Sequence, residues 1–406
     1  MRVSTSQIYD AGSRNIIDGQ GAVYKTQNQL STGRRFLTPQ DDPVAAAQVL
    51  LDTQAREVTA QYADNQSNAS TQLSLEESRL SSVVEAVQYI KEQVVAGGNA
   101  SYSDSQRATI ASNLQSQFDA LLGIANSADA SGHYLFSGFQ GETQPFQLTT
   151  TGAVNYVGDD GQRLLQVGAS RQIAVSDSGR DIFNNIRSGN GTFTTAAPQS
   201  APLNTGTGVI YPGTVNNPQS WTGHNYQISF TAPGTYDVID TTAGLPAIAT
   251  GVAYATGAAI TAIPGISFTI GGVPSAGDKF NVTPSTDQSL FTTLKNMITA
   301  FGTPVAGNDT LKAKVRSDIN AGMAGLDQAL DNVAGVQASI GSRMKELQGL
   351  SDISSSLDIQ YKDKISKLQD LDYTAAISLF TSQQTQLEAA QKSFAQISGL
   401  SLFKYI

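Results

Sequence analysis

Apolar side chains recur four and three residues apart over three long stretches of the chain. The first comprises Ala69, Leu73, Glu76, Leu80, Val83, Val87, Ile90 and Val94. The second comprises Ile110, Leu114, Gln117, Leu121, Ile124 and Ala128. The third comprises Val315, Ile319, Gly322, Leu326, Ala329, Val333, Val336 and Ile340. This spacing places each set on one stripe of a helix, and such a stripe has to be covered by other helices. We predict three long helices that cover one another.

Local signals mark where two of the helices begin. Ser103 and Gln106 stand three residues apart, the spacing of a capping box, in which each side chain satisfies a free amide of the other residue's backbone. Asp42 precedes Pro43, which places an N-cap acceptor before a proline at the first helical position. The spacing predicts helix starts after Ser103 and at Pro43.

Each end of the chain carries a further apolar stripe. Residues 4–31 contain a period-seven series, which is Tyr9, Ile16, Val23 and Leu30. Glycine costs about 1 kcal/mol against alanine inside a helix, so Gly12, Gly19 and Gly21 predict that this helix is not stable alone. Neither proline nor glycine stands between Leu350 and Ser398. The stripe there is Ala376, Phe380, Gln383, Leu387, Ala390, Phe394 and Ile397, followed by the apolar ending Leu400, Leu402, Phe403, Tyr405 and Ile406.

Two arrangements cover these terminal stripes. They can pair with each other within one chain as a coiled-coil hairpin, or they can be loose in the monomer and become ordered against neighbouring copies. The apolar ending of an otherwise polar chain favours the second arrangement. We therefore predict a polymerising subunit. Its predicted interface between copies is Tyr9, Ile16, Val23, Leu30, Phe380, Leu387, Phe394, Ile397, Leu400 and Leu402.

The middle of the chain has a different composition. Eleven of the 13 prolines lie between Pro145 and Pro304, where long helices are excluded. Residues 186–289 are rich in Thr, Gly, Ala and Pro, and segments 226–230 and 265–270 read as strands. Asp160-Gly161 is typical of a hairpin turn. We predict a β-rich insert between helical flanks.

We divide the chain into three domains on this basis. Residues 1–42 and 360–406 form a terminal helical assembly domain. Residues 43–185 and 290–359 form a helical rod with β-hairpins. Residues 186–289 form a β-rich variable outer domain.

Composition excludes several classes of function. The chain of 406 residues has a formal net charge of -9 and no dense basic cluster, so nucleic acid is not expected as a partner. It has no cysteine, which removes disulfides and thiolate chemistry. The uncharged stretch 247–263 is interrupted by glycine and threonine and is shorter than the roughly 20 residues of a membrane span. No membrane insertion is expected.

Residues that could carry chemistry are few. His133 and His224 are the only two histidines, and they are far apart in the sequence. The acidic pairs Asp41-Asp42 and Asp159-Asp160 adjoin Pro43 and Gly161, where capping and turn roles explain them. We expect no catalytic residue, cofactor or metal site, and hence no enzyme.

Several motifs resemble those of a known family. Residues 30–43, LSTGRRFLTPQDDP, resemble the flagellin-family signature between the first terminal helix and the next, and residues 368–376, LQDLDYTAA, resemble its C-terminal counterpart. Residues 134–138, YLFSG, and the ending 400–406, LSLFKYI, are most similar to family members at the hook–filament junction. The inter-helix link would contain Gly33, Pro39, Asp42 and Pro43. Glycine suits a left-handed C-cap there, and Pro39 is expected to keep the link extended.

The resemblance implies a mainly α protein with β structure. The expected flagellin-like fold has terminal coiled-coil helices, a helical rod with a β-hairpin, and an inserted β-rich outer domain. The implied function is that of a structural subunit joining hook to filament. Its implied partners are further copies of itself, a neighbouring hook-associated protein, flagellin, and a cytoplasmic export chaperone on the C-terminal helix. It would be secreted by type III export without a cleaved signal peptide. A filament flagellin, or a surface adhesin on a flagellin-like mount, remains an alternative.

Overall fold

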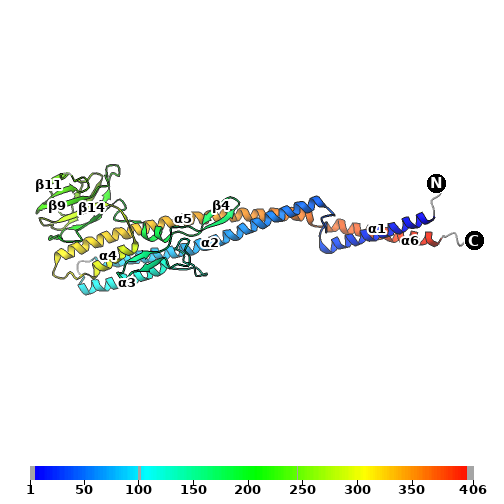
Figure 1. Ribbon diagram of the computed structural model, residues 1–406, viewed down its shortest axis with the longest axis horizontal. Coiled ribbons are helices and arrows are strands. Elements are labelled where there is room, and N and C mark those ends of the chain that lie inside the picture. The colour runs from blue at the N-terminus through cyan, green and yellow to red at the C-terminus, as the bar shows by residue number, and fades with distance from the viewer. Residues whose placement is uncertain (1–4, 99–101, 245, 400–406) are drawn as a thin grey trace, which may run out of the picture. The chain divides into compact units, whose positions relative to one another are not determined.

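The computed structural model describes residues 5–98, 102–244 and 246–399. The chain divides into two units. The terminal unit comprises residues 1–66 and 349–406, and the central unit comprises residues 67–348. Two long helices, α2 (Pro43–Gly97) and α5 (Asp309–Gln369), contribute residues to both units (Figure 1).

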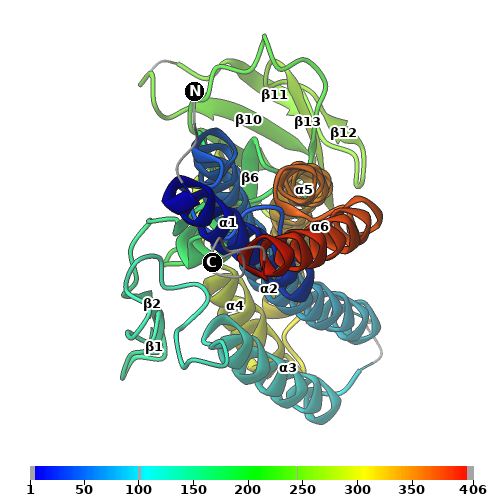
Figure 2. The same ribbon diagram turned by 90° about the vertical axis from the view of Figure 1, so that its right-hand side faces the viewer.

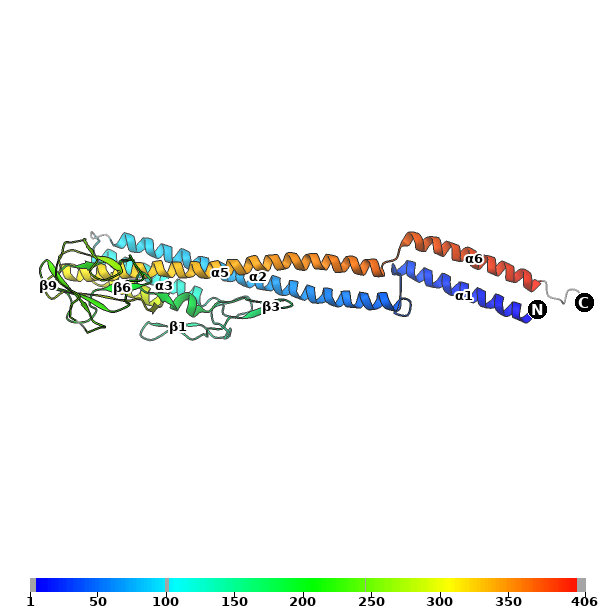
Figure 3. The ribbon, with the colours of Figure 1, turned by 90° about the horizontal axis from the view of Figure 1, so that it is seen from above.

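The described residues of the terminal unit are helical apart from the links between its helices. It contains α1 (Thr5–Thr32), α6 (Tyr373–Gly399), the first part of α2 and the last part of α5. Figure 3 shows α1 and α6 running side by side. The backbone amide of Ala45 donates to Oδ1 of Asp42 at 3.0 Å, so Asp42 caps α2 and Pro43 is its first residue, as predicted.

The central unit contains two further α-helices, α3 (Asp104–Ala125) and α4 (Leu290–Gly302), which pack against each other. The predicted capping box is confirmed, because Ser103 and Gln106 each accept from the other's backbone amide. The first apolar stripe is buried along its whole length on α2. The second predicted stripe extends beyond its helix. α3 ends at Ala125, and the last member of the stripe, Ala128, instead forms a β-bridge with Tyr134.

Two β-hairpins lie between α3 and the β-rich region. One pairs β1 (Phe146–Leu148) with β2 (Val154–Tyr156), and the other pairs β3 (Leu164–Gly168) with β4 (Arg171–Ala174). The prediction of a hairpin turn at Asp160-Gly161 is wrong. These residues lie in the loop between β2 and β3, which belong to different sheets.

The β-rich region lies on one side of α5, and the α3–α4 pair lies on the other (Figures 1 and 2). Its larger sheet has the order β11-β10-β9-β14-β6, and a second sheet has β12-β13-β7 with β8 also paired to β13. The two predicted strands are confirmed as β9 (Tyr226–Ala232) and β13 (Ile266–Gly271). The remaining strands of these sheets are β6 (Phe193–Ala196), β7 (Val209–Ile210), β8 (Thr214–Val215), β10 (Thr235–Asp240), β11 (Ala249–Ala253), β12 (Ala259–Ile260) and β14 (Lys279–Pro284).

Short elements connect the β-rich region to the helices. A single-turn π-helix, η1 (Arg180–Asn184), precedes a two-stranded sheet of β5 (Ile186–Arg187) and β15 (Asp287–Gln288). The sheets of the β-rich region share an apolar core that includes Ile228, Val238 and Phe280, each 0% exposed. Alternating burial along β9, β10 and β13 explains why a period of two was readable in the sequence.

The buried polar residue Glu76 interrupts the first apolar stripe on α2. Glu76 is 2% exposed, and its Oε1 accepts from the backbone amide of Asp177 at 3.1 Å. Its Oε2 is buried without a hydrogen-bond partner in the described part of the chain. Burial, and secondarily the negative charge of Asp177, raise the pKa of Glu76 to about 8, although Arg343 opposes the shift. Glu76 is therefore largely protonated at neutral pH.

This pKa predicts a pH-dependent stability. A glutamate whose pKa is raised on folding stabilises the protein below its ordinary pKa of 4.5, and that contribution is lost as the pH rises through about 8. Relative to Glu76→Gln, the free energy of unfolding of the unmodified chain should fall between pH 5 and pH 9, by at most about 1.4 kcal/mol per pH unit. Urea unfolding at several pH values measures this. Glu85→Gln, an exposed position on the same helix, should show no such trend.

Candidate assembly interface

The two predicted terminal stripes face each other within one chain. The rings of Tyr9 and Phe394 meet edge to face at 5.7 Å between centroids. Gly12 leaves room for Phe394, because a Cβ there would lie 2.5 Å from the ring atom Cδ2. Further along, Oγ1 of the buried Thr26 donates to Oε1 of Gln383 at 2.7 Å. The prediction that these stripes find cover only between copies is therefore wrong.

The cover is nevertheless incomplete. Seven of the predicted interface residues are only half-buried: Tyr9, Ile16, Val23, Leu30, Phe380, Leu387 and Phe394. Ile397 is 44% exposed. Leu400 and Leu402 lie outside the described residues. A pair of helices covers only one side of each stripe, so α1 and α6 keep apolar surface for further partners.

The terminal unit differs from the central unit in how its apolar side chains are placed. Among its described residues, the buried apolar side chains are Phe36, Ala45 and Ala376. Its exposed large apolar side chains are Ile8, Ile17, Tyr24, Leu37, Val44, Leu50, Leu51, Val58, Ile353, Ile359, Tyr373, Ile377, Leu379 and Ile397. Monomeric soluble proteins rarely expose apolar surface so densely, and such surfaces mark sites of association. This distribution is the strongest structural sign of an assembly interface.

The exposed residues of α2 and α5 were not anticipated from the sequence. Val44, Leu51 and Val58 stand seven residues apart on α2, a signal that was available. The signal is weak because the positions of α2 that face α5 there are polar, so no continuous apolar stripe precedes Ala69.

The link between α1 and α2 begins at Gly33. Its φ of +69° is the left-handed geometry predicted for a C-cap, and its amide donates to the carbonyl of Gln29 at 2.9 Å. A Cβ at Gly33 would lie 2.9 Å from Oη of Tyr373, the first residue of α6. Glycine is therefore favoured here by the left-handed backbone, and the tip of the Tyr373 side chain lies close to it.

The link between α1 and α2 is hydrogen-bonded to the link between α5 and α6. The amide of Arg35 donates to the carbonyl of Gln369 at 2.7 Å, and the amide of Leu371 donates to the carbonyl of Gly33 at 2.9 Å. Arg34 and Asp370 form an isolated antiparallel bridge. Backbone groups freed at the ends of α1 and α5 are thus satisfied by each other.

Pro39 is not in an extended link as predicted. It occupies the second position of a β-turn, in which the amide of Asp41 donates to the carbonyl of Thr38 at 3.0 Å. Oδ1 of Asp41 pairs with Nζ of Lys25 at 2.7 Å, and Oδ2 accepts from the amides of Leu37 and Thr38. The Lys25 contact and these two amides hold the pKa of Asp41 well below its usual range. Asp41 therefore stays charged and fixes the turn.

Two glycines provide an internal test of this link. Gly33→Ala forces a Cβ into left-handed backbone and should lower the free energy of unfolding of the terminal unit by about 1–2 kcal/mol. Gly21→Ala should instead raise it by about 1 kcal/mol, since Gly21 is helical, exposed and has nothing within 4 Å of an added Cβ. Hydrogen exchange of α1 amides measures both. Equal effects of the two changes would contradict the assigned role of Gly33.

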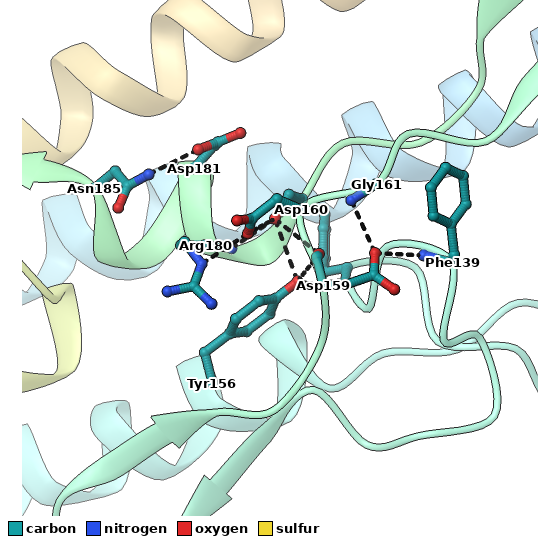
Figure 4. Close-up of polar contacts among 10 residues, drawn as sticks. Phe139, Tyr156, Asp159, Asp160, Gly161, Arg180, Asp181 and Asn185 are labelled. Atoms are coloured by element: carbon teal, nitrogen blue, oxygen red, sulfur yellow. Dashed lines mark hydrogen bonds and ion pairs between the residues drawn. The ribbon is translucent and has the colours of Figure 1, made fainter.

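The second acidic pair also has structural partners. Oδ1 of Asp159 accepts from the amides of Phe139 and Gly161 at 2.9 and 2.8 Å, and Oδ1 of Asp160 pairs with Nε of Arg180 at 2.7 Å (Figure 4). The hydroxyl of Tyr156 donates to the carbonyl of Asp159 at 2.7 Å. These contacts hold the loop between β2 and β3, so they account for both carboxylates.

The histidines lie apart from each other. His224 Nδ1 lies 2.7 Å from Oδ2 of Asp240 in the β-rich region, and His133 lies in the loop between α3 and β1. No group of three His, Asp or Glu side chains that could hold a metal occurs among residues 5–98, 102–244 and 246–399. In the same ranges, no helix is both long and apolar enough to cross a membrane.

Comparison with known proteins places the chain in a class. Residues 3–141 match the bacterial flagellin N-terminal helical region, and residues 323–406 match the bacterial flagellin C-terminal helical region. Over 404 residues the chain is 30% identical to flagellar hook-associated protein 3 of Salmonella typhimurium, covering 100% of this chain and 99% of that protein.

Two solved structures agree with this match. The flagellar hook associated protein-3 of Legionella pneumophila superposes with a TM-score of 0.74 at 30% identity, covering 79% of this chain and 98% of that one. The FlgL of Xanthomonas campestris gives a TM-score of 0.71 at 29% identity, covering 78% and 99%. The fold is thus that of the flagellin-like proteins, with terminal helical regions and a β-rich middle. The chain belongs to the flagellar hook-associated protein 3 family, and it is a structural component of the bacterial flagellum.

Proposed function

We propose that the chain is the subunit that joins hook to filament and that it polymerises through its terminal unit. The observation that carries this proposal is the exposed apolar surface of that unit, where Phe36, Ala45 and Ala376 are the buried apolar side chains of the described residues. A unit that covers so little of its apolar surface is stabilised by association with other subunits.

The arrangement suggests how the parts are used. The terminal helices, 1–42 and 360–406, supply the contacts between copies. Residues 43–185 with 290–359 form a rod, and residues 186–289 an outer domain. On its two sides the layer of copies contacts a neighbouring hook-associated protein and flagellin. The contribution of the chain is mechanical, so no catalytic step is assigned to it.

Export is part of the same proposal. The subunit leaves the cell by flagellar type III export without a cleaved signal peptide, and a cytoplasmic chaperone covers α6 until then. The apolar side chains Ile377, Leu379 and Ile397 support this, because each is at least 44% exposed and needs cover before assembly.

Deletion of the gene tests the proposed function. The deleted strain should carry hooks without filaments under the electron microscope, and flagellin should appear in the medium. Restoration by the unmodified chain is the control. Loss of the dominant protein from sheared flagella would instead indicate a filament flagellin.

A second deletion tests the outer domain. A chain that lacks residues 186–290 should still support filament growth if the terminal unit and the rod make the essential contacts. Loss of surface binding with intact motility would point to an adhesin on a flagellin-like mount.

A further inference from the structure

The first part of α2 carries two stripes at the four-three spacing. The inner stripe is buried or half-buried and consists of Ala45, Val49, Asp52, Arg56, Thr59, Ala63 and Gln66. The outer stripe is exposed and consists of Val44, Ala47, Leu51, Gln54, Val58 and Gln61. Both stripes lie in the terminal unit.

The apolar side chains are on the side that faces away from the chain's own helices. Val44, Leu51 and Val58 are 69%, 65% and 47% exposed. The inner stripe instead uses polar contacts with α5: Nε of Arg56 pairs with Oδ1 of Asp358 at 2.7 Å, and Nε2 of Gln66 donates to Oγ of Ser354 at 3.1 Å. In water, a helix usually packs its apolar stripe against the rest of the protein and exposes its polar stripe to solvent. The outer stripe therefore has the residue spacing of a helix–helix contact, but it is exposed in the single chain.

We propose that this outer stripe packs on α5 of a second copy of the chain, against its exposed side, where Ile353 and Ile359 are 57% and 66% exposed. The proposal rests on the proposed function and places an interface on α2, beyond the terminal helices. From Val44 to Gln61 the stripe rises about 26 Å, at about 1.5 Å per residue, and it contains no charged side chain. Its burial thus requires no desolvation of an ion.

Charge disfavours a second α2 as the partner of the outer stripe. Glu57 and Asp64 flank the outer stripe seven residues apart, and both are exposed without an ion pair among the described residues. Two α2 stripes packed together would place these carboxylates on one seam, where like charges repel. On α5, Nζ of Lys364 lies over the ring of Tyr361 and has no carboxylate partner in the described part of the chain.

The pairing of two different surfaces has a consequence for symmetry. Each copy offers an α2 stripe to one neighbour and an α5 face to the other, which is a head-to-tail contact. Such contacts continue from copy to copy and generate rings or helical layers instead of closed dimers. A junction layer needs this kind of contact.

Cysteine cross-linking tests the pairing directly, since the chain has no cysteine of its own. Flagella are isolated from cells that express Leu51→Cys/Ile359→Cys and are treated with a short bis-maleimide. We expect a ladder of covalent multimers beyond the dimer. Leu51→Cys alone should remain monomeric, and so should Leu164→Cys/Ile359→Cys, in which Leu164 is a matched leucine at 60% exposure. Monomers from the first variant, or dimers from Leu51→Cys alone, would overturn the proposal.

Complementation separates this proposal from the proposed function. In a strain that lacks the gene, Leu51→Glu should lower the amount of the chain in isolated flagella at least about tenfold, whereas Leu164→Glu should leave it unchanged. If the unmodified chain and Leu51→Glu restore filaments equally well, the proposed packing of α2 on α5 of another copy is wrong, whereas the proposed junction function is unaffected. If the strain that lacks the gene still carries filaments, the proposed function fails, and the cross-linking result still decides whether α2 packs on α5 of another copy.

Discussion

Phe394→Asp is expected to abolish incorporation of the chain into flagella, with the secreted subunit recovered from the medium. The ring of Phe394 lies edge to face with Tyr9 and over Gly12, so the substitution places a carboxylate in the contact between α1 and α6. Phe394 is half-buried in the single chain, so the full cost of several kcal/mol for burying a carboxylate without a partner applies once other copies cover this contact. Since about 1.4 kcal/mol is a factor of ten in an equilibrium constant, we expect at least a roughly 100-fold loss. Leu387→Asp, facing Gly19, should act in the same way.

A neighbouring residue provides the control for this experiment. Ser393 is exposed on α6, so Ser393→Asp adds the same charge one residue away and outside the stripe. It should be incorporated normally. Immunoblots of isolated flagella and of the culture medium measure both variants. Normal filaments built from Phe394→Asp would mean that the α1–α6 contact is dispensable for assembly.

The helices were predictable because their apolar spacing is local. Leu80 and Val87 are fixed on one stripe by the geometry of a single helix, whichever partner covers it. The same holds for the caps, since Asp42 and Ser103 act on amides of their own helices. Patterns between residues this close in the sequence can be interpreted without knowledge of the tertiary fold.

The assembly surface was only partly predictable, for two reasons. Gly12 counts against a helix until Phe394 is known to lie over it, and then the absence of a Cβ becomes necessary. On α2, Thr59 and Gln66 occupy the inner stripe while Leu51 points outward, which reverses the usual sorting of polar and apolar residues. A protein whose final environment includes other copies does not have to sort its residues as a monomer does.

The aromatic cluster of the central unit could not be predicted from periodicity. Phe291 on α4 lies within 5.4–5.9 Å, between ring centroids, of Phe118 on α3, Phe146 on β1 and Phe183 on η1. These rings come from four elements that are far apart in the sequence, so no local pattern connects them. The cluster joins the helices to the first hairpin.

Phe291→Ala should therefore produce a large loss of stability in the central unit. Phe291 is 2% exposed, and truncation of a buried phenylalanine costs about 3–5 kcal/mol because the transfer term and the cavity add. For a unit of this size we expect a fall in Tm of about 10 °C. Phe139→Ala is the matched control, since Phe139 is 67% exposed and its truncation should change stability by no more than about 0.5 kcal/mol.

Thermal and urea unfolding followed by circular dichroism compare the two variants. The contacts of Phe291 lie wholly in the central unit, whereas those of Phe394 lie in the terminal unit. At temperatures where Phe291→Ala remains folded, it should still enter flagella, unlike Phe394→Asp. Equal stability of Phe291→Ala and Phe139→Ala would show that the aromatic cluster does not hold the helices and the hairpin together.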